Sequence, residues 1–95
     1  MTTIAQTIVS QIKALDRRAL MAWGAKDFVN MGDGLKFKTS GMTPWKGYVY
    51  IKLNEATDLY GITFYRLRKA EMKVDLELAD VYVDMLVECI DDFVG

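Results

Sequence analysis

The chain has 95 residues, of which 52% are hydrophobic and 26% are charged, and its formal net charge is −1 at pH 7. This composition excludes a disordered chain and predicts a single domain, residues 1–95, with one hydrophobic core. The chain contains no histidine, so it lacks the commonest general base and a usual zinc ligand.

Two helices are predicted at the N-terminus. Over residues 4–15 the apolar residues recur at helical spacing, and Thr3 and Gln6 have the spacing of a capping box. A second, short helix is predicted over residues 19–23, with Gly24 as its C-terminal stop. The chain therefore begins with a helical segment of two parts.

The period of the apolar residues changes to two after a turn at residues 30–34, which holds two glycines and an asparagine. Alternating, β-branched and aromatic residues then predict four strands, over residues 35–39, 48–53, 59–68 and 72–78. The connections are short, which favours antiparallel pairing of consecutive strands.

A C-terminal helix is predicted over residues 80–93, with Asp80 as its N-cap. Its apolar stripe consists of Tyr82, Met85, Leu86, Cys89, Ile90 and Phe93. Cys89 is the single cysteine of the chain, so it cannot form an internal disulfide. We expect it to be a buried, unreactive thiol without a nucleophilic role.

These elements predict an α+β fold that is a two-layer sandwich, with the order α-α-β-β-β-β-α. The four strands form a mainly antiparallel sheet, and such a sheet can have one covered face and one face exposed to water. The N- and C-terminal helices flank the strands in sequence, and both would pack on the covered face.

Short segments spread over most of the chain resemble one protein family. They are residues 3–8 (TIAQTI), 24–29 (GAKDFV), 35–37 (LKF), 60–68 (YGITFYRLR) and 81–86 (VYVDML). The family consists of small uncharacterised proteins of bacteriophages, prophages and plasmids, with motifs similar to TIAxxI, MTGAKxF, YxIxFxxIR and VYxDxL. The resemblance implies a cytoplasmic accessory protein of a mobile element, and it assigns no activity, substrate, cofactor or catalytic residue.

Two positions depart from the pattern of this family. Trp23 stands where the family usually has a threonine, and residues 15–18 (LDRR) replace a turn similar to Gly-Gly-Asn. The first helix is therefore expected to run longer in this chain than in the family.

The charge of the chain changes sign at about residue 70. Residues 1–70 carry eleven Lys and Arg against five Asp and Glu, whereas residues 71–95 carry one lysine against eight carboxylates. Five of these carboxylates fall on or beside the predicted last helix: Asp80, Asp84, Glu88, Asp91 and Asp92. The spacing and glycine of a calcium loop are absent, so a solvated acidic face is favoured over a metal site. As a functional hypothesis, these five residues bind a basic groove of a protein partner.

Lysines and tyrosines of two predicted strands form an alternative site. Lys36 and Lys38 share one face of the first strand, and Tyr48, Tyr50 and Lys52 share one face of the second. If these faces coincide, charge and aromatic rings interleave, as in proteins that bind single-stranded nucleic acid. The sequence pI of about 5.3 argues against a dedicated nucleic-acid-binding protein, so nucleic acid is the less favoured partner.

Two further features have ordinary structural interpretations. The Gly32-Asp33-Gly34 segment would fit a phosphate loop only if a strand led into it and a helix followed, and neither is predicted. Several large side chains near predicted loops are either core and lid residues or a contact patch: Met21, Trp23, Met31, Met42 and Trp45.

No general base, nucleophile or metal-ligand set can be assembled from these residues, so we predict no enzymatic activity, no cofactor and no metal. The leading hypothesis is a small non-enzymatic interaction protein of a phage or other mobile element. It would bind a host protein or a second copy of itself, as a homodimer. No apolar run approaches the ~18 residues that span a membrane, and no signal peptide is recognisable, so we expect a protein of the bacterial cytoplasm without membrane contact.

Overall fold

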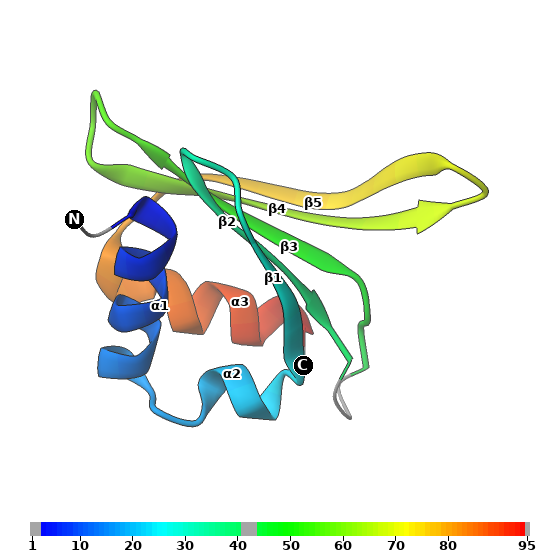
Figure 1. The fold of residues 1–95 in the computed structure, drawn as a ribbon, viewed down its shortest axis with the longest axis horizontal. Helices are drawn as coiled ribbons and strands as arrows, with labels where there is room; N and C mark the ends of the chain where they lie inside the picture. The colour runs from blue at the N-terminus through cyan, green and yellow to red at the C-terminus, as the bar shows by residue number, and fades with distance from the viewer. Residues whose placement is uncertain (1–2, 41–43, 95) are drawn as a thin grey trace.

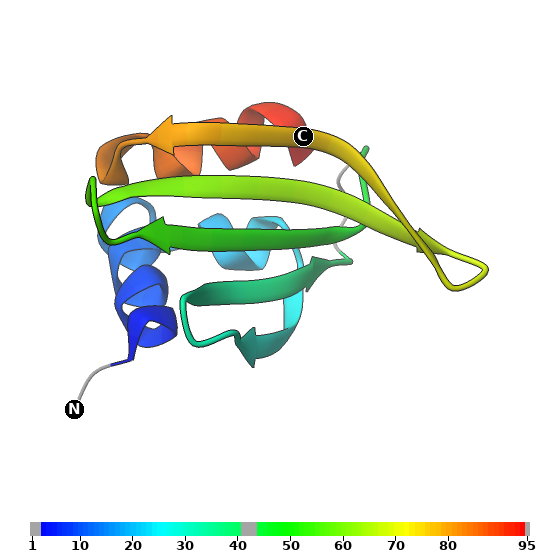
Figure 2. The ribbon, with the colours of Figure 1, turned by 90° about the horizontal axis from the view of Figure 1, so that it is seen from above.

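The computed structural model describes residues 3–40 and 44–94. The elements follow in the order α1 (Ile4–Leu15), α2 (Ala19–Ala22), β1 (Ala25–Asn30), β2 (Gly34–Thr39), β3 (Tyr48–Asn54), β4 (Leu59–Arg68), β5 (Glu71–Val81), the 3-10 helix η1 (Val83–Met85) and α3 (Leu86–Val94). In the described residues the five strands form one antiparallel sheet, in which neighbours in space are neighbours in sequence (Figure 1, Figure 2). The predicted α+β class is therefore confirmed.

α1 begins and ends where its sequence predicts. The Thr3 side chain accepts a hydrogen bond from the Gln6 backbone amide at 3.1 Å, and the Gln6 side chain accepts one from the Thr3 amide at 2.9 Å. The predicted capping box is thus confirmed. α2 ends at Ala22, and Gly24 follows with a φ of +61°, a left-handed conformation that stops a helix at little cost.

The helices lie on one face of the sheet, and no described helix covers the other face (Figure 1). α1 contributes Ile8 and Ile12 to the core, and α3 contributes Leu86 and Ile90, all fully buried. The strands contribute a facing set of buried residues: Leu35, Phe37, Val49, Ile51, Tyr60, Ile62, Phe64 and Val81. The core therefore lies between two layers, as the sequence predicts.

The sheet contains a fifth strand that the sequence does not predict, so the prediction of four strands is wrong. β1 pairs with β2 at the edge of the sheet. All its residues except Ala25 are exposed, and Asp27 interrupts the pairing with a φ of +56°. An exposed, irregular edge strand has no alternation of buried and exposed residues, so its sequence lacks the pattern from which a strand is predicted.

β5 confirms the predicted strand over residues 72–78 and extends it to Val81. Val81 is buried opposite Tyr60, which holds the chain in the sheet. Asp80 lies in an irregular part of this strand with a φ of +56°. The prediction that Asp80 caps a helix is therefore wrong.

The last helical segment begins later than residue 80. η1 covers Val83–Met85 and α3 follows, so Tyr82 and Met85 precede the amphipathic turns of α3. Both side chains are exposed, although the sequence places them on the buried stripe. The late start of α3 is the reason, because a helix begun at residue 80 would turn these residues inward.

Cys89 is half-buried on α3, not fully buried as predicted. Burial raises the pKa of its thiol above the ordinary value, and the negative charges of Glu88 and Asp92 raise it further. The thiol is therefore mainly protonated at neutral pH, and we expect it to react slowly with modifying reagents.

The hairpin of β4 and β5 extends beyond the other strands (Figure 1, Figure 2). β3 begins at Tyr48, which pairs with Tyr65 of β4, so the later residues of β4 pair only with β5. We call this two-stranded extension, residues 66–74, the arm. It turns at Lys69 and Ala70, whose φ angles are +47° and +68°.

Candidate functional site

The open face of the sheet brings together all five residues of the nucleic-acid hypothesis. Alternate residues of β2 and β3 are buried beneath the helices, so the lysines and tyrosines between them point away from the core. The register makes two cross-strand pairs, Lys36 with Tyr50 and Lys38 with Tyr48. Lys52 lies on the same face of β3. The coincidence of the two faces is confirmed, whereas nucleic-acid binding stays a prediction.

Tyr65 of β4 extends this set, although the sequence analysis did not single it out. Its ring stacks on that of Tyr48, with centroids 5.3 Å apart and 14° between the planes. The amines of Lys36 and Lys38 both lie 5.8 Å from the centroid of the Tyr48 ring, within the range of a cation–π contact. We call Lys36, Lys38, Tyr48 and Tyr65 the lysine–tyrosine row. It crosses three strands, and burial raises the pKa of Tyr65.

Asp33, in the turn before β2, lies at the other end of the open face. The Tyr50 hydroxyl donates a hydrogen bond to Asp33 Oδ1, and the Lys52 amine lies 3.7 Å from Asp33 Oδ2. Burial, followed by the hydrogen bond and the charge of Asp33, raises the pKa of Tyr50 from 10.0 to about 12. Tyr50 and Lys52 are therefore engaged by a carboxylate, and the groups free to meet a ligand lie toward Tyr48.

A hollow lies beside Tyr48 at the base of the arm. Its lining includes Lys38, Lys46, Leu67 and Arg68, and no carboxylate of the described residues contributes to it. The sequence analysis missed Lys46 and Arg68, because a loop residue and the last residue of a strand carry no periodic signal. The hollow adds positive charge next to the stacked tyrosines.

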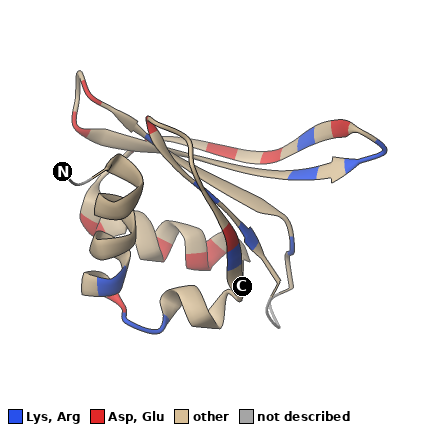
Figure 3. Ribbon diagram, viewed as in Figure 1, with Lys and Arg blue, Asp and Glu red and all other residues tan. Residues whose placement is uncertain are grey.

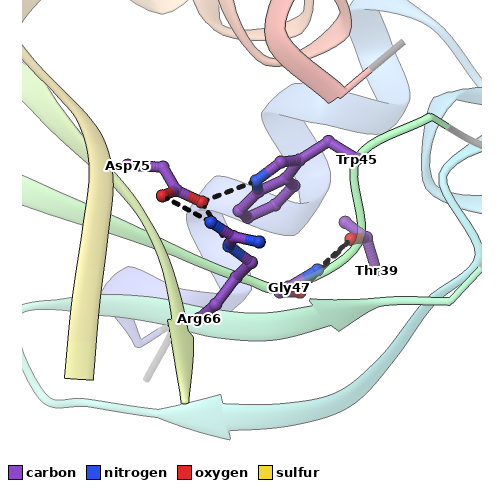
Figure 4. A network of polar contacts seen from close by, with 5 residues as sticks. All are labelled: Thr39, Trp45, Gly47, Arg66 and Asp75. Atoms are coloured by element: carbon purple, nitrogen blue, oxygen red, sulfur yellow. Dashed lines mark hydrogen bonds and ion pairs between the residues drawn. The ribbon is translucent and has the colours of Figure 1, made fainter. Parts of the chain in front are cut away.

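A polar network fixes the base of the arm (Figure 4). Arg66 donates hydrogen bonds from Nε and Nη2 to Asp75, at 2.6 and 3.1 Å, and Trp45 Nε1 donates to the same carboxylate at 2.9 Å. The Arg66 hydrogen bonds, followed by that of Trp45, hold the pKa of Asp75 below its usual value. Arg66 is thus a structural residue, and its paired guanidinium is not offered to a ligand.

The loop before β3 is held by a second contact in the same region (Figure 4). Buried Thr39 donates from Oγ1 to the Gly47 carbonyl at 3.2 Å and accepts from the Gly47 amide at 3.0 Å. A Cβ at Gly47 would lie 2.7 Å from the Tyr65 carbonyl oxygen, so β4 approaches this loop closely. The backbone beside Lys46 is therefore fixed against the strand that carries Tyr65.

The acidic residues of the leading hypothesis do not form one helix face. They are distributed over β5 (Asp80), η1 (Asp84) and α3 (Glu88, Asp91 and Asp92), as Figure 3 shows for the acidic bands along α3. Asp91 Oδ1 accepts a hydrogen bond from Nε1 of buried Trp23 at 3.1 Å, so this carboxylate fastens α2 to α3. Across residues 3–40 and 44–94, no group of three acidic or thiol side chains could hold a metal ion.

The segment around Gly32 is a turn between β1 and β2, and Gly32 has a φ of +84°. A strand does lead into this turn, contrary to the sequence analysis. A strand rather than a helix follows it, so the requirement of a phosphate loop is still not met.

The tryptophans and methionines near the loops do not share one environment. Trp23 is buried in the core, whereas Met21 and Met31 are exposed. Trp45 is half-buried, and its ring lies edge-on to that of Phe64 at a centroid distance of 5.7 Å. Met42 lies outside the described residues.

Searches of protein-family models, of curated proteins and of solved structures found no match to this chain. The resemblance to proteins of bacteriophages and plasmids therefore stays a prediction. Among the helices of the described residues, none has the length and apolar character needed to cross a membrane.

Proposed function

We propose that this protein is a small non-enzymatic binding protein of a phage or another mobile element, and that its open sheet face binds single-stranded nucleic acid. One observation carries the proposal: the lysine–tyrosine row lies on the face that no described helix covers. Proteins that bind single strands without sequence preference combine aromatic stacking platforms with a positively charged track. The lysine–tyrosine row offers both within three adjacent strands.

A base that stacks on Tyr48 has to displace the amines of Lys36 and Lys38 from the ring. Each exposed cation–π contact contributes ~0.5–1 kcal/mol, so the two together are comparable with the ~1–3 kcal/mol of stacking a base on an aromatic side chain. The displaced amines stay beside the ring, where they can pair with phosphates of the bound strand. This phosphate pairing, added to the stacking, favours binding.

The net charge of −1 does not oppose this proposal, because much of the negative charge lies away from the open face. α3, with its acidic residues, lies on the covered face of the sheet, below the strands in Figure 1 and Figure 3. Salt screens exposed charges over a length of about 10 Å at 0.1 M, so these carboxylates act weakly across the two layers. Asp33 lies on the open face. So does exposed Glu77, which pairs with Thr63 beside Tyr50. These two carboxylates confine the proposed track to the end near Tyr48 and the arm.

The positions of the acidic residues in the structure support a protein-binding function less than their spacing in the sequence does. They are split over three elements, and Asp91 is hydrogen-bonded to Trp23. Binding of a host protein through these residues therefore ranks second among the proposals.

Fluorescence anisotropy with labelled single-stranded DNA and RNA of about 15 nucleotides, near the site size of small sheet-based binders, tests the first proposal. Replacing both Lys36 and Lys38 by Ala should weaken binding. It should also reduce the slope of log K against log salt by about 0.7 for each phosphate that the variant no longer neutralises. Tyr48→Ala should remove ~1–3 kcal/mol of stacking, which corresponds to a roughly 5- to 150-fold weaker affinity.

The matched control is the double variant Lys13→Ala, Arg17→Ala, which removes two exposed cations from the helical side. It should leave binding unchanged, because neither side chain belongs to the open face. Equal effects of the two double variants would show that only net charge matters. Absence of binding to either kind of strand at low salt would refute the proposal.

A further inference from the structure

The arm exposes an apolar strip at one end of β5. Leu67, Met72 and Val74 are 55%, 58% and 46% exposed, and the pairs Leu67–Met72 and Tyr65–Val74 place them on one side of the hairpin. The arm also carries three exposed cations, Arg68, Lys69 and Lys73, and one exposed carboxylate, Glu71. The pairs Arg66–Lys73 and Arg68–Glu71 place Lys73, Arg68 and Glu71 on the side of the hairpin opposite the apolar strip, and Lys69 lies at the turn. A two-stranded ribbon is only marginally stable by itself, and grouped apolar side chains on its surface are typical of an interaction site.

A second exposed apolar group lies at the other end of β5, where the chain enters α3. Tyr82, Val83 and Met85 are 59%, 41% and 42% exposed. Three exposed carboxylates accompany them: Asp80, Asp84 and Glu88. We call these six residues the junction patch. Tyrosine and methionine are enriched in protein interfaces, and the sequence pattern alone would have placed two of these side chains in the core.

We infer that the arm of one copy of this protein binds the junction patch of a second copy, head to tail. The two surfaces are complementary in net charge, because the arm exposes three cations against one carboxylate and the junction patch exposes three carboxylates. Each surface also carries exposed apolar side chains that a second copy can cover. β5 has 11 residues and runs from one surface to the other. At about 3.3 Å per residue this separates them by roughly 33 Å.

The separation decides the kind of assembly. A molecule cannot bind its own arm, so the contact forms between molecules and joins two different surfaces. Such a heterologous contact produces open chains or closed rings, in contrast to the homodimer that the sequence analysis considered. The surfaces are small, and interfaces below about 1,200 Å² are typical of weak, transient association. Reversible oligomers at high protein concentration are therefore expected.

A second copy offers apolar side chains and opposite net charge to both surfaces, whereas a phosphate backbone is fully complementary to neither surface. The carboxylates of the junction patch repel phosphates, and the apolar strip of the arm gains nothing from them. The arm shares Leu67 and Arg68 with the hollow beside Tyr48. The association is therefore measured on protein freed of nucleic acid, and the variants that test it leave Lys36 and Lys38 unchanged.

Sedimentation velocity of nuclease-treated protein over a range of concentrations measures the association. The average mass of the wild-type protein should rise past that of a dimer as concentration increases, and it should fall when salt is added. The arm variant Lys69→Glu, Lys73→Glu should associate at least roughly tenfold more weakly, because like charges then face each other. The junction variant Asp84→Lys, Glu88→Lys should behave in the same way.

An equimolar mixture of the arm and junction variants gives the sharpest result. The reversed arm meets the reversed junction patch, and the two unchanged surfaces meet each other, so association should return. The matched control Lys13→Glu, Arg17→Glu should associate like the wild type. All the replaced side chains are exposed, so circular dichroism and thermal unfolding should remain those of the wild type.

Two results would overturn the inference. One is a wild-type protein that stays monomeric up to about 1 mM, where even a weak complex would be populated. The other is a mixture of the two variants that stays monomeric while the wild type associates, because the association would then use other surfaces. Neither experiment changes Lys36 or Lys38, so the proposed function is tested separately.

Discussion

The covered face of the sheet holds Phe37, Ile51 and Phe64 without exposure to solvent, whereas the lysines of the open face keep part of their surface in water. Residues of the covered face are enclosed by apolar side chains of the helices. Contacts on the open face join neighbouring strands, as in the stacked pair of Tyr48 and Tyr65. Cross-strand pairs contribute ~0.2–1 kcal/mol each, and a buried large side chain contributes ~1.5–3 kcal/mol. The covered face therefore maintains the fold, and the open face can serve binding.

The largest expected effect tests this contrast along a single strand. Phe64→Ala should lower the free energy of unfolding by ~3–5 kcal/mol, because the ring is fully buried against Trp45 and Phe93. Leu67→Ala, on the exposed arm of the same strand, should change it by less than about 0.5 kcal/mol. Urea denaturation measures both values. Similar decreases in the free energy of unfolding for the two variants would contradict the contrast between core and arm, because the arm would then belong to the cooperative core.

A smaller effect concerns the register that builds the lysine–tyrosine row. An added Cβ at Gly34 would lie 1.9 Å from the Ile51 carbonyl oxygen, so Gly34→Ala should lower the free energy of unfolding by ~1–3 kcal/mol. At Gly61 the nearest atom would be 3.5 Å away. Gly61→Ala should therefore be neutral or stabilise by up to ~1 kcal/mol. Thermal unfolding compares the two, and a tolerated Gly34→Ala would show that β2 can shift against β3.

The turn of the arm offers a stabilising substitution. Ala70 has a φ of +68°, and a left-handed conformation costs a residue with a Cβ ~1–2 kcal/mol. Ala70→Gly should therefore raise the free energy of unfolding by ~1 kcal/mol and slow amide hydrogen exchange in the arm. Ala56→Gly is the control, in a turn where φ is not positive, and it should give no gain. Equal responses would mean that the arm turn is not held in this conformation.

The smallest expected effect concerns the pKa of Tyr50 on the open face. Ultraviolet titration should find one tyrosine, Tyr50, that ionises near pH 12, and Asp33→Asn should lower its pKa toward the ordinary value of 10.0. The folded pKa lies above the unfolded one, so the stability that Tyr50 contributes is complete below pH ~10 and is lost as the pH rises toward 12. An unchanged titration in Asp33→Asn would show that Asp33 does not hold this phenol in its protonated form.

Part of the candidate site was accessible from sequence. Side-chain direction alternates along any strand. The period of two therefore places Lys36 and Lys38 on the same face of one strand and assigns Tyr48 to one face of the next. Tyr65, Lys46 and Arg68 were not accessible in this way. They join the site through strand register and the path of a loop, and both depend on contacts between residues distant in sequence.

The sequence by itself determined the elements that local interactions specify. The capping box of Thr3 and Gln6 and the left-handed stop at Gly24 act within a few residues. α1 therefore begins and ends where its pattern predicts, and α2 begins at the predicted residue and ends one residue earlier, at Ala22. Only the tertiary structure decided the two ends of the sheet. β1 forms because β2 offers it an edge, and β5 continues because Val81 is buried opposite Tyr60.

The distribution of charge was also determined partly by the sequence and partly by the tertiary structure. Their change of sign near residue 70 is plain in the sequence, but the sequence does not say whether the two sets meet in space. The tertiary structure decided this in two ways: α3 lies on the covered face of the sheet, away from the lysines of the open face, whereas β5 pairs with β4 and brings Asp75 to Arg66 (Figure 3). Electrostatic interaction depends on distance in space and on screening, so only the fold decides which charges of the two segments neutralise each other and which form separate surfaces.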